Sequence, residues 1–474
     1  MTSIASTTNQ QVSDEPIATS GATGRAPQPR FTRRPLRSLL RSPLLAAGLS
    51  LAAGAAFAEP APVEGPCPDG PPPGTRCLRG VDSAGADYLI AVPQDWNRVL
   101  VVHAHGGPTL EKPDVKRADA DIKRWSIHLR AGYAYAASAF RQGGVAVRSA
   151  AEDTERVRRI FVTHVAKPRR TVLHGQSWGA GVAAKTAEMY ADSLAGASPY
   201  DGVLLTSGVV SGGSTAYDFR LDLRVVYQHL CNNHPRPDEP QYPLWMGLPE
   251  DAQLTRAELA SRVDECLGVR RKPQERSAEQ QARLDTITRV IRIEPASVAA
   301  HLNWGTWHFQ DIARRYQWRS VFGNQQVRYS GSSDDAALNA GVARYQPDPE
   351  ARAAFAADTD PDGRIPVPVI TVHGIGDPTA FVEMESTFRE TMEKAGSASR
   401  LVQVFTEDAV HSYLSDAVYP TVMDALVKWI DTGDKPTPAQ IAESCRSFEA
   451  TFGAGCRFRP DYQPPRLAER VPAR

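Results

Sequence analysis

The chain has 474 residues, of which 42% are hydrophobic and 23% are charged, a balance that is ordinary for a soluble globular protein. Its 54 basic and 54 acidic side chains cancel to a formal net charge of +0, so electrostatics give no case for a nucleic-acid or anionic-membrane partner. The length predicts two or three domain-sized units, or one large domain with an insertion.

The N-terminal region is typical of an export signal. A polar stretch is followed by several arginines between Arg30 and Arg41, and then by the apolar run 44–54. That run is too short to span a bilayer, and a small-x-small cleavage site ends at Ala58. We expect a signal peptide cleaved near Ala58 and a periplasmic or secreted protein with no later membrane span. Residues 32–37 faintly resemble a twin-arginine signal, and an uncleaved anchor is the alternative.

All six cysteines lie beyond this cleavage site, as expected for an oxidising compartment. Proximity in the sequence favours three local disulfides, although other pairings are open. The candidate pairs are Cys67 with Cys77, Cys231 with Cys266, and Cys445 with Cys456. Metal binding is the alternative, but the cysteine and histidine spacings do not match a zinc site. We therefore expect neither a metal nor another cofactor.

Short β-branched runs alternate with helical stretches along much of the chain, which predicts a mostly parallel, doubly wound α/β sheet buried on both faces. Strands are expected at 87–93, 98–104, 132–138, 170–174, 201–208, 366–374 and 401–405. Helices are expected at 119–131 and 149–165.

The most informative motif is Gly-x-Ser-x-Gly, centred on Ser177. The bare pattern is weak, but here an apolar strand precedes it and a helix of small residues follows. This context predicts a nucleophile elbow, in which the turn is so sharp that only glycine fits at Gly175 and Gly179. The serine hydroxyl would then stand above the carboxyl edge of the sheet.

Between about residues 212 and 360 the alternation stops, and the segment becomes polar, helical and rich in Trp, Arg and Pro. We interpret it as a lid inserted over the carboxyl edge of the sheet, where open α/β sheets bind ligands. Its aromatic residues would line a pocket or form a small core of the lid. The expected division is 1–58 signal region, 59–212 first part of the core, 213–360 lid, 361–432 second part of the core and 433–474 disulfide-stapled tail.

An elbow serine needs a general base and an acid that orients the base. Asp377 follows the expected strand 366–374, and His411 follows the last strand, so Ser177, Asp377 and His411 occur in the required order. Asp360 and Asp362 are rival acids, but they precede their strand. His174 and His373, on strands beside these turns, are expected to be hydrogen-bonded core residues.

Stabilising an oxyanion needs two fixed N–H donors. The backbone N–H of Trp178, at the start of the helix after the serine, is the first candidate. The second should come from the glycine loop after strand 98–104. Pro108 cannot donate, so Gly107 is preferred, with Gly106 behind it.

The strand order, elbow, triad order and glycine loop resemble the α/β-hydrolase superfamily over roughly residues 85–212 and 360–432. More narrowly, residues 105–108 (His-Gly-Gly-Pro) with 177–179 (Ser-Trp-Gly) are similar to the prolyl-aminopeptidase branch, whose exported bacterial members carry a lid. The resemblance implies the α/β-hydrolase fold and a hydrolytic activity.

We expect an exported serine hydrolase that acts through an acyl-enzyme, most simply on carboxylic esters. The alternative is a prolyl- or tripeptidyl-aminopeptidase, which would need lid carboxylates such as Glu239 or Glu250 to hold a free amino terminus. A third possibility is a non-catalytic binding module. The expected partner is a small-molecule or peptide substrate, and the sequence does not indicate an oligomeric state.

Overall fold

In the computed structural model, residues 59–192, 197–472 and 474 are described. The expected signal peptide and its cleavage site at Ala58 lie outside these residues. Within the described part of the chain, no helix is both long enough and apolar enough to cross a membrane.

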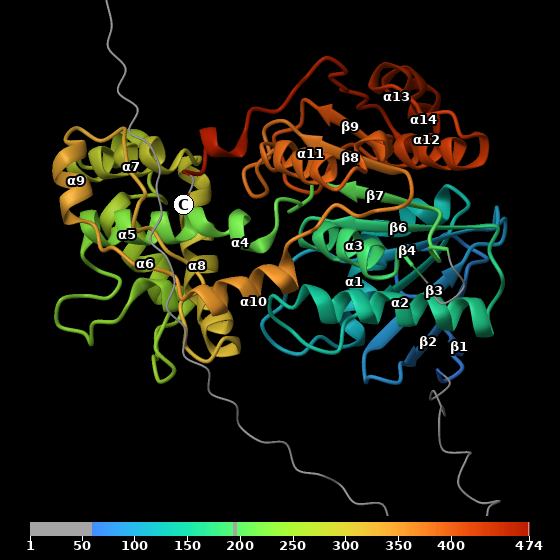
Figure 1. The fold of residues 1–474 in the computed structure, drawn as a ribbon, viewed down its shortest axis with the longest axis horizontal. Helices are drawn as coiled ribbons and strands as arrows, with labels where there is room; N and C mark the ends of the chain where they lie inside the picture. The colour runs from blue at the N-terminus through green and yellow to red at the C-terminus, as the bar shows by residue number, and fades with distance from the viewer. Residues whose placement is uncertain (1–58, 193–196, 473) are drawn as a thin grey trace, which may run out of the picture. The chain divides into compact units, whose positions relative to one another are not determined.

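Nine strands form one sheet (Figure 1). In chain order they are β1 (Val63–Gly65), β2 (Arg76–Val81), β3 (Asp87–Val92), β4 (Val99–Ala104), β5 (Ala134–Ser138), β6 (Arg170–Gln176), β7 (Gly202–Thr206), β8 (Val369–Gly374) and β9 (Leu401–Thr406). Their spatial order is β1-β2-β3-β5-β4-β6-β7-β8-β9. The first three strands and the β3–β5 pair are antiparallel, and every pair from β5 to β9 is parallel. The expected α/β-hydrolase fold is confirmed.

Helices cover both faces of this sheet. They are α1 (Val115–Arg130), α2 (Val147–His164), α3 (Trp178–Met189), α11 (Met384–Lys394) and α12 (Val418–Thr432). One core joins α2, α3 and α11 to the sheet, and the other joins α1 and α12 to it. In β4, Leu100 and Val102 enter the first core while Val99 and Val101 enter the second. Alternate residues thus pack into opposite cores, which explains why this strand is an unbroken apolar run.

Between β7 and β8 the chain forms a helical insertion (Figure 1). Its helices are α4 (Gly213–Ala216), α5 (Asp218–Cys231), α6 (Arg256–Leu267), α7 (Ala278–Ile291), α8 (Val298–Arg315), α9 (Asp335–Gly341) and α10 (Pro349–Thr359). Thr255 and Ser277 begin α6 and α7 with capping boxes. Helix α5 packs on α7 and α8, whereas α10 packs on α2 and α3 of the sheet layer.

Two small helices, α13 (Pro438–Ser444) and α14 (Arg446–Phe452), follow α12 near the C-terminus. The described 3-10 turns are η1 (Leu244–Met246), η2 (Pro273–Glu275), η3 (Pro295–Ser297), η4 (Ala398–Arg400) and η5 (Leu467–Glu469).

The seven strands expected from the sequence lie within a few residues of β3 to β9. The edge strand β1 and its neighbour β2 were not expected, because they lie in or beside a lead rich in Pro and Gly. Helix α1 begins earlier than expected because Asp114 caps it by accepting a hydrogen bond from Lys116 N.

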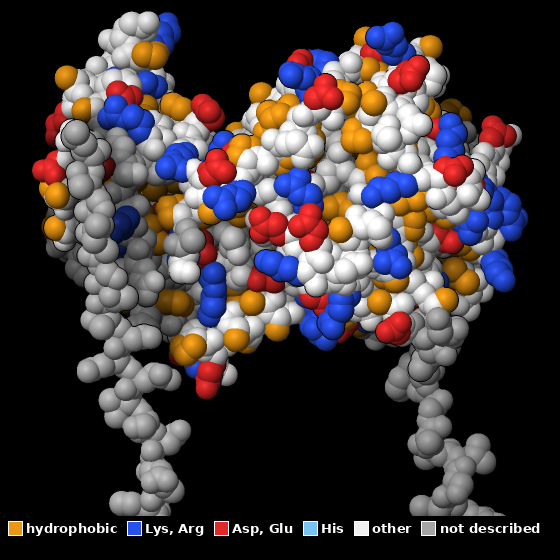
Figure 2. Space-filling model, turned by 45° about the horizontal axis from the view of Figure 1, so that its top comes forward, with side chains coloured by type: hydrophobic (Ala, Val, Ile, Leu, Met, Phe, Trp, Pro, Cys, Tyr) orange, Lys and Arg blue, Asp and Glu red, His pale blue; other side chains and the backbone are white. Residues whose placement is uncertain are grey.

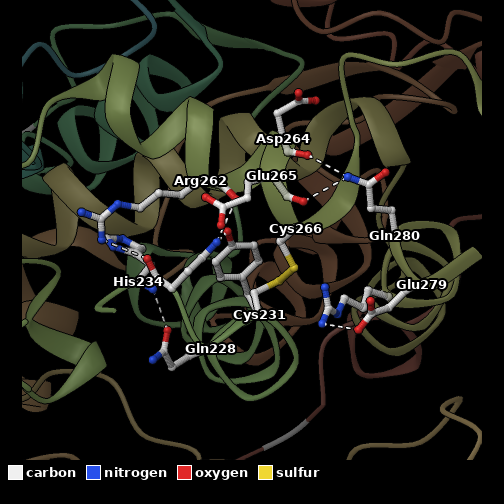
Figure 3. Close-up of a disulfide and its surroundings, with 12 residues drawn as sticks. Gln228, Cys231, His234, Arg262, Asp264, Glu265, Cys266, Glu279 and Gln280 are labelled. Carbon is white, nitrogen blue, oxygen red and sulfur yellow. Dashed lines mark hydrogen bonds and ion pairs between the residues drawn. A yellow bond between two sulfur atoms is a disulfide. The ribbon is translucent and has the colours of Figure 1, made fainter. Parts of the chain in front are cut away.

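The three cysteine pairs favoured by proximity are the three disulfides of the structure. Cys67–Cys77 ties the N-terminal lead to β2, and Cys445–Cys456 closes the turn around α14. Cys231–Cys266 joins α5 to α6 inside the insertion (Figure 3). Beside it, Gln280 of α7 donates to the carbonyl of Glu265, at 3.0 Å, so a third helix is attached to the same junction.

The surface carries charges of both signs. On the face drawn in Figure 2, Lys and Arg are interspersed with Asp and Glu, and small hydrophobic areas lie between them. Such a mixture is typical of a solvated surface. It agrees with the balanced net charge of the sequence.

Replacing Cys231 and Cys266 together by Ala should destabilise the insertion. The disulfide closes a segment with a sequence separation of 35 residues. Removing it should lower the free energy of unfolding by roughly 3 to 4 kcal/mol, because the unfolded chain regains its freedom. Urea unfolding followed by circular dichroism checks this, with the double variant of Cys445 and Cys456, at a separation of 11 residues, as the shorter-loop comparison. Equal stability of wild type and the Cys231 and Cys266 variant would contradict the prediction.

Candidate active site

Ser177 lies at the turn between β6 and α3, with backbone angles φ 56° and ψ −123°. A positive φ is costly for a residue with a Cβ and persists only where the surroundings enforce it. The two motif glycines permit this turn. A Cβ on Gly175 would lie 2.2 Å from the carbonyl oxygen of Gly179, and one on Gly179 would lie 2.1 Å from that of Ala104. The strand and helix are therefore packed backbone to backbone, and the serine side chain is held at the carboxyl edge of the sheet.

Three side chains predicted from the sequence meet at this edge. Ser177 Oγ lies 2.7 Å from His411 Nε2. On the other side of the ring, His411 Nδ1 lies 2.8 Å from Asp377 Oδ2 and 3.0 Å from Oδ1. Asp377 follows β8 and His411 follows β9. The arrangement can pass a proton from the serine to the imidazole while the carboxylate orients the ring.

Asp377 is fixed as an acceptor. Its Oδ1 receives the backbone N–H groups of Thr379, at 2.8 Å, and Ala380, at 3.0 Å. Burial alone would raise the pKa of Asp377, but interactions with His373 and His411 outweigh burial and lower it to about 2. The rival acids lie elsewhere. Asp360 accepts hydrogen bonds from Ser214, and Asp362 pairs with Arg364.

A second histidine lies behind Asp377. His373, fully buried in β8, has its Nε2 3.5 Å from Asp377 Oδ2 and its Nδ1 3.0 Å from Glu385 Oε1. Its Nε2 also donates to the carbonyl of Ala380 at 2.8 Å. Burial would lower the pKa of His373, but these two carboxylates outweigh burial and raise it to about 10. His373 is thus a hydrogen-bonded core residue, as expected, and its raised pKa keeps it protonated beside Asp377 near pH 7, which the sequence did not indicate.

His174, by contrast, is a hydrogen-bonded core residue as expected. It contacts Thr206 Oγ1 at 3.2 Å and the imidazoles of His103 and His128. Burial holds the pKa of His174 well below its usual value. This cluster is therefore neutral at physiological pH.

Two residues that line the cavity with Ser177 have backbone amides without an acceptor in the described chain. Trp178 N is the first amide of α3, where no helical acceptor exists. Gly107 has φ 66°, which favours glycine, and its amide makes no hydrogen bond within the described chain. Both residues line the same cavity as Ser177. Gly106 instead offers its carbonyl, which accepts from Arg117.

Helix α8 of the insertion contacts two of the loops that carry these groups. His301 Nε2 lies 3.1 Å from the carbonyl oxygen of Pro378, next to Asp377. His308 Nε2 lies 3.1 Å from that of Pro108, next to Gly107. Burial lowers the pKa of His301 to about 3 and that of His308 to about 4, so both rings are neutral near pH 7. Since a carbonyl only accepts, each Nε2 carries the proton and donates.

A cavity of about 450 Å³ opens above the serine. Its walls come from the sheet loops and from the insertion, which contributes Tyr217, Arg220 and Trp304. Arg117, Asp121 and Arg124, from α1, also line it. Trp304 belongs to the aromatic stretch of the insertion that was expected to line a pocket or form a small core of the lid, and it lines this cavity. The arginines and Asp121 were not singled out in the sequence, where they appear as ordinary members of helices.

The carboxylates that an aminopeptidase would need do not line this cavity. Glu239 lines another cavity, of about 400 Å³, and is bonded to Arg262 at 2.5 Å. Glu250 does not line the cavity above Ser177. Among the residues that the structure describes, no group of three or more His, Cys, Asp and Glu side chains could hold a metal ion.

No family model matches the chain, and no curated protein matches it either. Solved structures with a similar fold include the rice cell wall degrading esterase LipA from Xanthomonas oryzae, at 14% identity and a TM-score of 0.35 over 75% of this chain and 89% of that one. Feruloyl esterase B from Aspergillus oryzae has 12% identity and a TM-score of 0.42, over 80% and 86% of the two chains. A hormone-sensitive lipase from a metagenome library has 12% identity and a TM-score of 0.37, over 80% and 87%. Because the TM-scores are below 0.5, the fold assignment rests on the strand order of this chain.

His373 should make stability dependent on alkaline pH. A pKa raised from 6.5 to about 10 means that its contribution is complete below about pH 6.5 and is lost as the pH rises through about 10. His373→Gln should lower the free energy of unfolding by roughly 3 to 5 kcal/mol below pH 6.5, and the difference from wild type should shrink toward pH 10. Urea unfolding at pH 6, 8 and 10 measures it, with the exposed-site variant His164→Gln as control. A difference that stays constant with pH would refute this role.

Proposed function

We propose that this chain is an exported serine hydrolase that cleaves carboxylic esters. The observation that carries the proposal is the continuous contact from Ser177 Oγ to His411 Nε2, at 2.7 Å, and from His411 Nδ1 to Asp377, at 2.8 Å. A serine, an imidazole and a carboxylate in this order form the arrangement that activates a hydroxyl as a nucleophile.

In the proposed reaction, Ser177 Oγ attacks the ester carbonyl and its proton passes to His411 Nε2. Asp377 accepts the hydrogen bond of His411 Nδ1–H and stabilises the imidazolium that forms. His411 then gives the proton to the departing alcohol, and the acyl group stays on Ser177. Water activated by His411 hydrolyses this acyl-enzyme and restores the serine.

Gly107 and Trp178 are the proposed oxyanion donors. Their free amides in the serine cavity support this role, because fixed N–H groups stabilise the charge of the tetrahedral intermediate. The start of α3 adds the positive end of a helix dipole. Gly106, the reserve candidate, would assist by holding the loop through its carbonyl contact with Arg117.

We further propose that the insertion acts as a lid and that the protein is exported. The contribution of Tyr217, Arg220 and Trp304 to the cavity wall supports a role in substrate selection. Three disulfides support an oxidising compartment, either the periplasm or the extracellular space.

Ser177→Ala should abolish labelling by a fluorophosphonate probe and lower kcat for a 4-nitrophenyl ester by about 10⁴-fold or more, because no other hydroxyl among the described residues forms a hydrogen bond with the His411 ring. Ser207→Ala is a matched control. Ser207 also follows a strand of the sheet and has a positive φ, but its buried hydroxyl makes no hydrogen bond in the described chain. Gel fluorescence and steady-state rates provide the measurement. Undiminished labelling of Ser177→Ala would reject this serine as the nucleophile, and an unlabelled wild type would favour a non-catalytic module.

Esters should be cleaved far better than peptide-like amides. An alcohol leaves more readily than an amine, and the cavity above Ser177 lacks Glu239 and Glu250 as anchors for an amino terminus. Rates with 4-nitrophenyl acetate and butyrate are to be compared with those for proline and tripeptide 4-nitroanilides. Turnover of the anilides alone would establish the aminopeptidase alternative instead.

A further inference from the structure

Arg220 is a buried cation without a carboxylate partner. Arg220 is only 5% exposed, yet it forms no ion pair with any acid of the described chain. The nearby acids Asp218 and Asp222 pair with Arg352 and Arg474 instead. Its side chain makes one hydrogen bond, from Nη1 to the carbonyl of Ala216 at 3.4 Å, and its Nε has no acceptor. Burial lowers the pKa of Arg220 to about 10, which leaves it protonated near pH 7. A desolvated and unpaired charge is costly unless a ligand compensates it.

Aromatic rings hold the guanidinium in place. Its central carbon lies 4.3 Å from the ring centre of Trp304, 4.6 Å from that of Phe219 and 5.3 Å from that of Tyr217. Stacking of this kind fixes the plane of the group while leaving its N–H edge available. Arg220 and two of these rings, Trp304 and Tyr217, line the cavity that contains Ser177.

The other arginines of the same cavity are already paired. Arg117 lies 3.2 Å from Asp121, and Arg124 lies 2.9 Å from Asp416, which also pairs with Arg130 at 2.8 Å. Each of these two cavity arginines therefore has a carboxylate neighbour, whereas Arg220 has none in the described chain. Arg220 therefore leaves an uncompensated positive charge in the wall of this cavity.

We propose that Arg220 binds a carboxylate group of the substrate, so that the preferred esters carry one negative charge besides the scissile bond. This inference rests on the proposed ester hydrolysis at Ser177. A single planar guanidinium matches the two oxygens of a carboxylate and balances one charge, whereas a dianionic phosphate would remain partly uncompensated in a buried cavity. Neutral esters would leave the arginine desolvated and unpaired, and this penalty selects against them.

The test compares esters that differ only in this charge. Mono-4-nitrophenyl adipate is paired with its methyl ester to place the carboxylate on the acyl side, and 4-acetoxybenzoate with its methyl ester to place it on the alcohol side. In wild type, the anionic member of at least one pair should have a kcat/KM about tenfold higher or more. Arg220→Met should lower that value by roughly 10- to 150-fold, the range for a hydrogen bond to a charged group. The neutral ester should not lose activity, and its kcat/KM should stay the same or rise because the penalty of the unpaired arginine is removed.

Matched variants separate charge recognition from structure. Arg220→Lys keeps the charge and should retain part of the preference. Arg256→Met is the control, because Arg256 also stacks on a tryptophan of α8, Trp307 at 4.8 Å, but does not line the cavity. It should leave the ratio of anionic to neutral rates unchanged. The proposal is overturned if neither anionic ester is preferred, if Arg220→Met keeps the preference, or if Arg220→Met impairs both esters of a pair alike.

A binding measurement tests the carboxylate site separately from ester hydrolysis. Monomethyl adipate, titrated calorimetrically into Ser177→Ala protein, should bind at least tenfold more tightly than dimethyl adipate, and the additional change Arg220→Met should remove the difference. If no ester is hydrolysed but this difference is present, the proposed function fails and the carboxylate site stands. If esters are hydrolysed but the difference is absent, the carboxylate site is rejected.

Discussion

The close approach of two backbones at the serine turn is the constraint on which the site depends. Gly175 faces the carbonyl of Gly179, and Gly179 faces that of Ala104, in both cases with no room for a Cβ. This contact sets the start of α3 directly against β4 and β6, and Ser177 between them adopts a positive φ of 56° with ψ −123°. Because α3 begins at the next residue, the amide of Trp178, which lines the same cavity as Ser177, has no acceptor within the helix. One steric condition thus positions a hydroxyl and a hydrogen-bond donor together.

The remaining groups depend on contacts between segments far apart in the sequence. Asp377 is held from behind by His373, which Glu385 of α11 holds in turn. From the opposite side, α8 contacts the loop after β8 through His301 and the loop after β4 through His308. The insertion therefore does more than wall the cavity, because it fixes the loops that carry the triad-like acid and the glycine amide. A displacement of α8 would therefore disturb both loops together.

The sheet and the three residues Ser177, Asp377 and His411 could be predicted from the sequence, because they depend on patterns that are local in the chain. Buried parallel strands are unbroken apolar runs, and the elbow needs glycine at fixed spacing. Local pattern did not reveal His373 as a buried cation, since its charge arises from Asp377 and Glu385, the latter on a helix packed beside the strand. Nor did it reveal Arg220. Arginine in an amphipathic helix is ordinarily a solvated residue. Tyr217 and Phe219 are its neighbours in the sequence, but only tertiary packing buries Arg220 and brings the distant Trp304 against it.

The disulfide between Cys231 and Cys266 has a consequence for how the protein is produced. Helix α5 carries Arg220 near its first turn and Cys231 at its last residue, so a covalent bond restrains the helix that bears the cavity's unpaired charge. Material made in a reducing cytosol would retain the elbow serine, since no cysteine contributes to that turn, but would lack this restraint on α5. If Ser177 and Arg220 act as proposed, preparations from different expression compartments would share the nucleophile and differ in selectivity. A comparison of substrate preferences should therefore state whether the disulfides of each sample were formed.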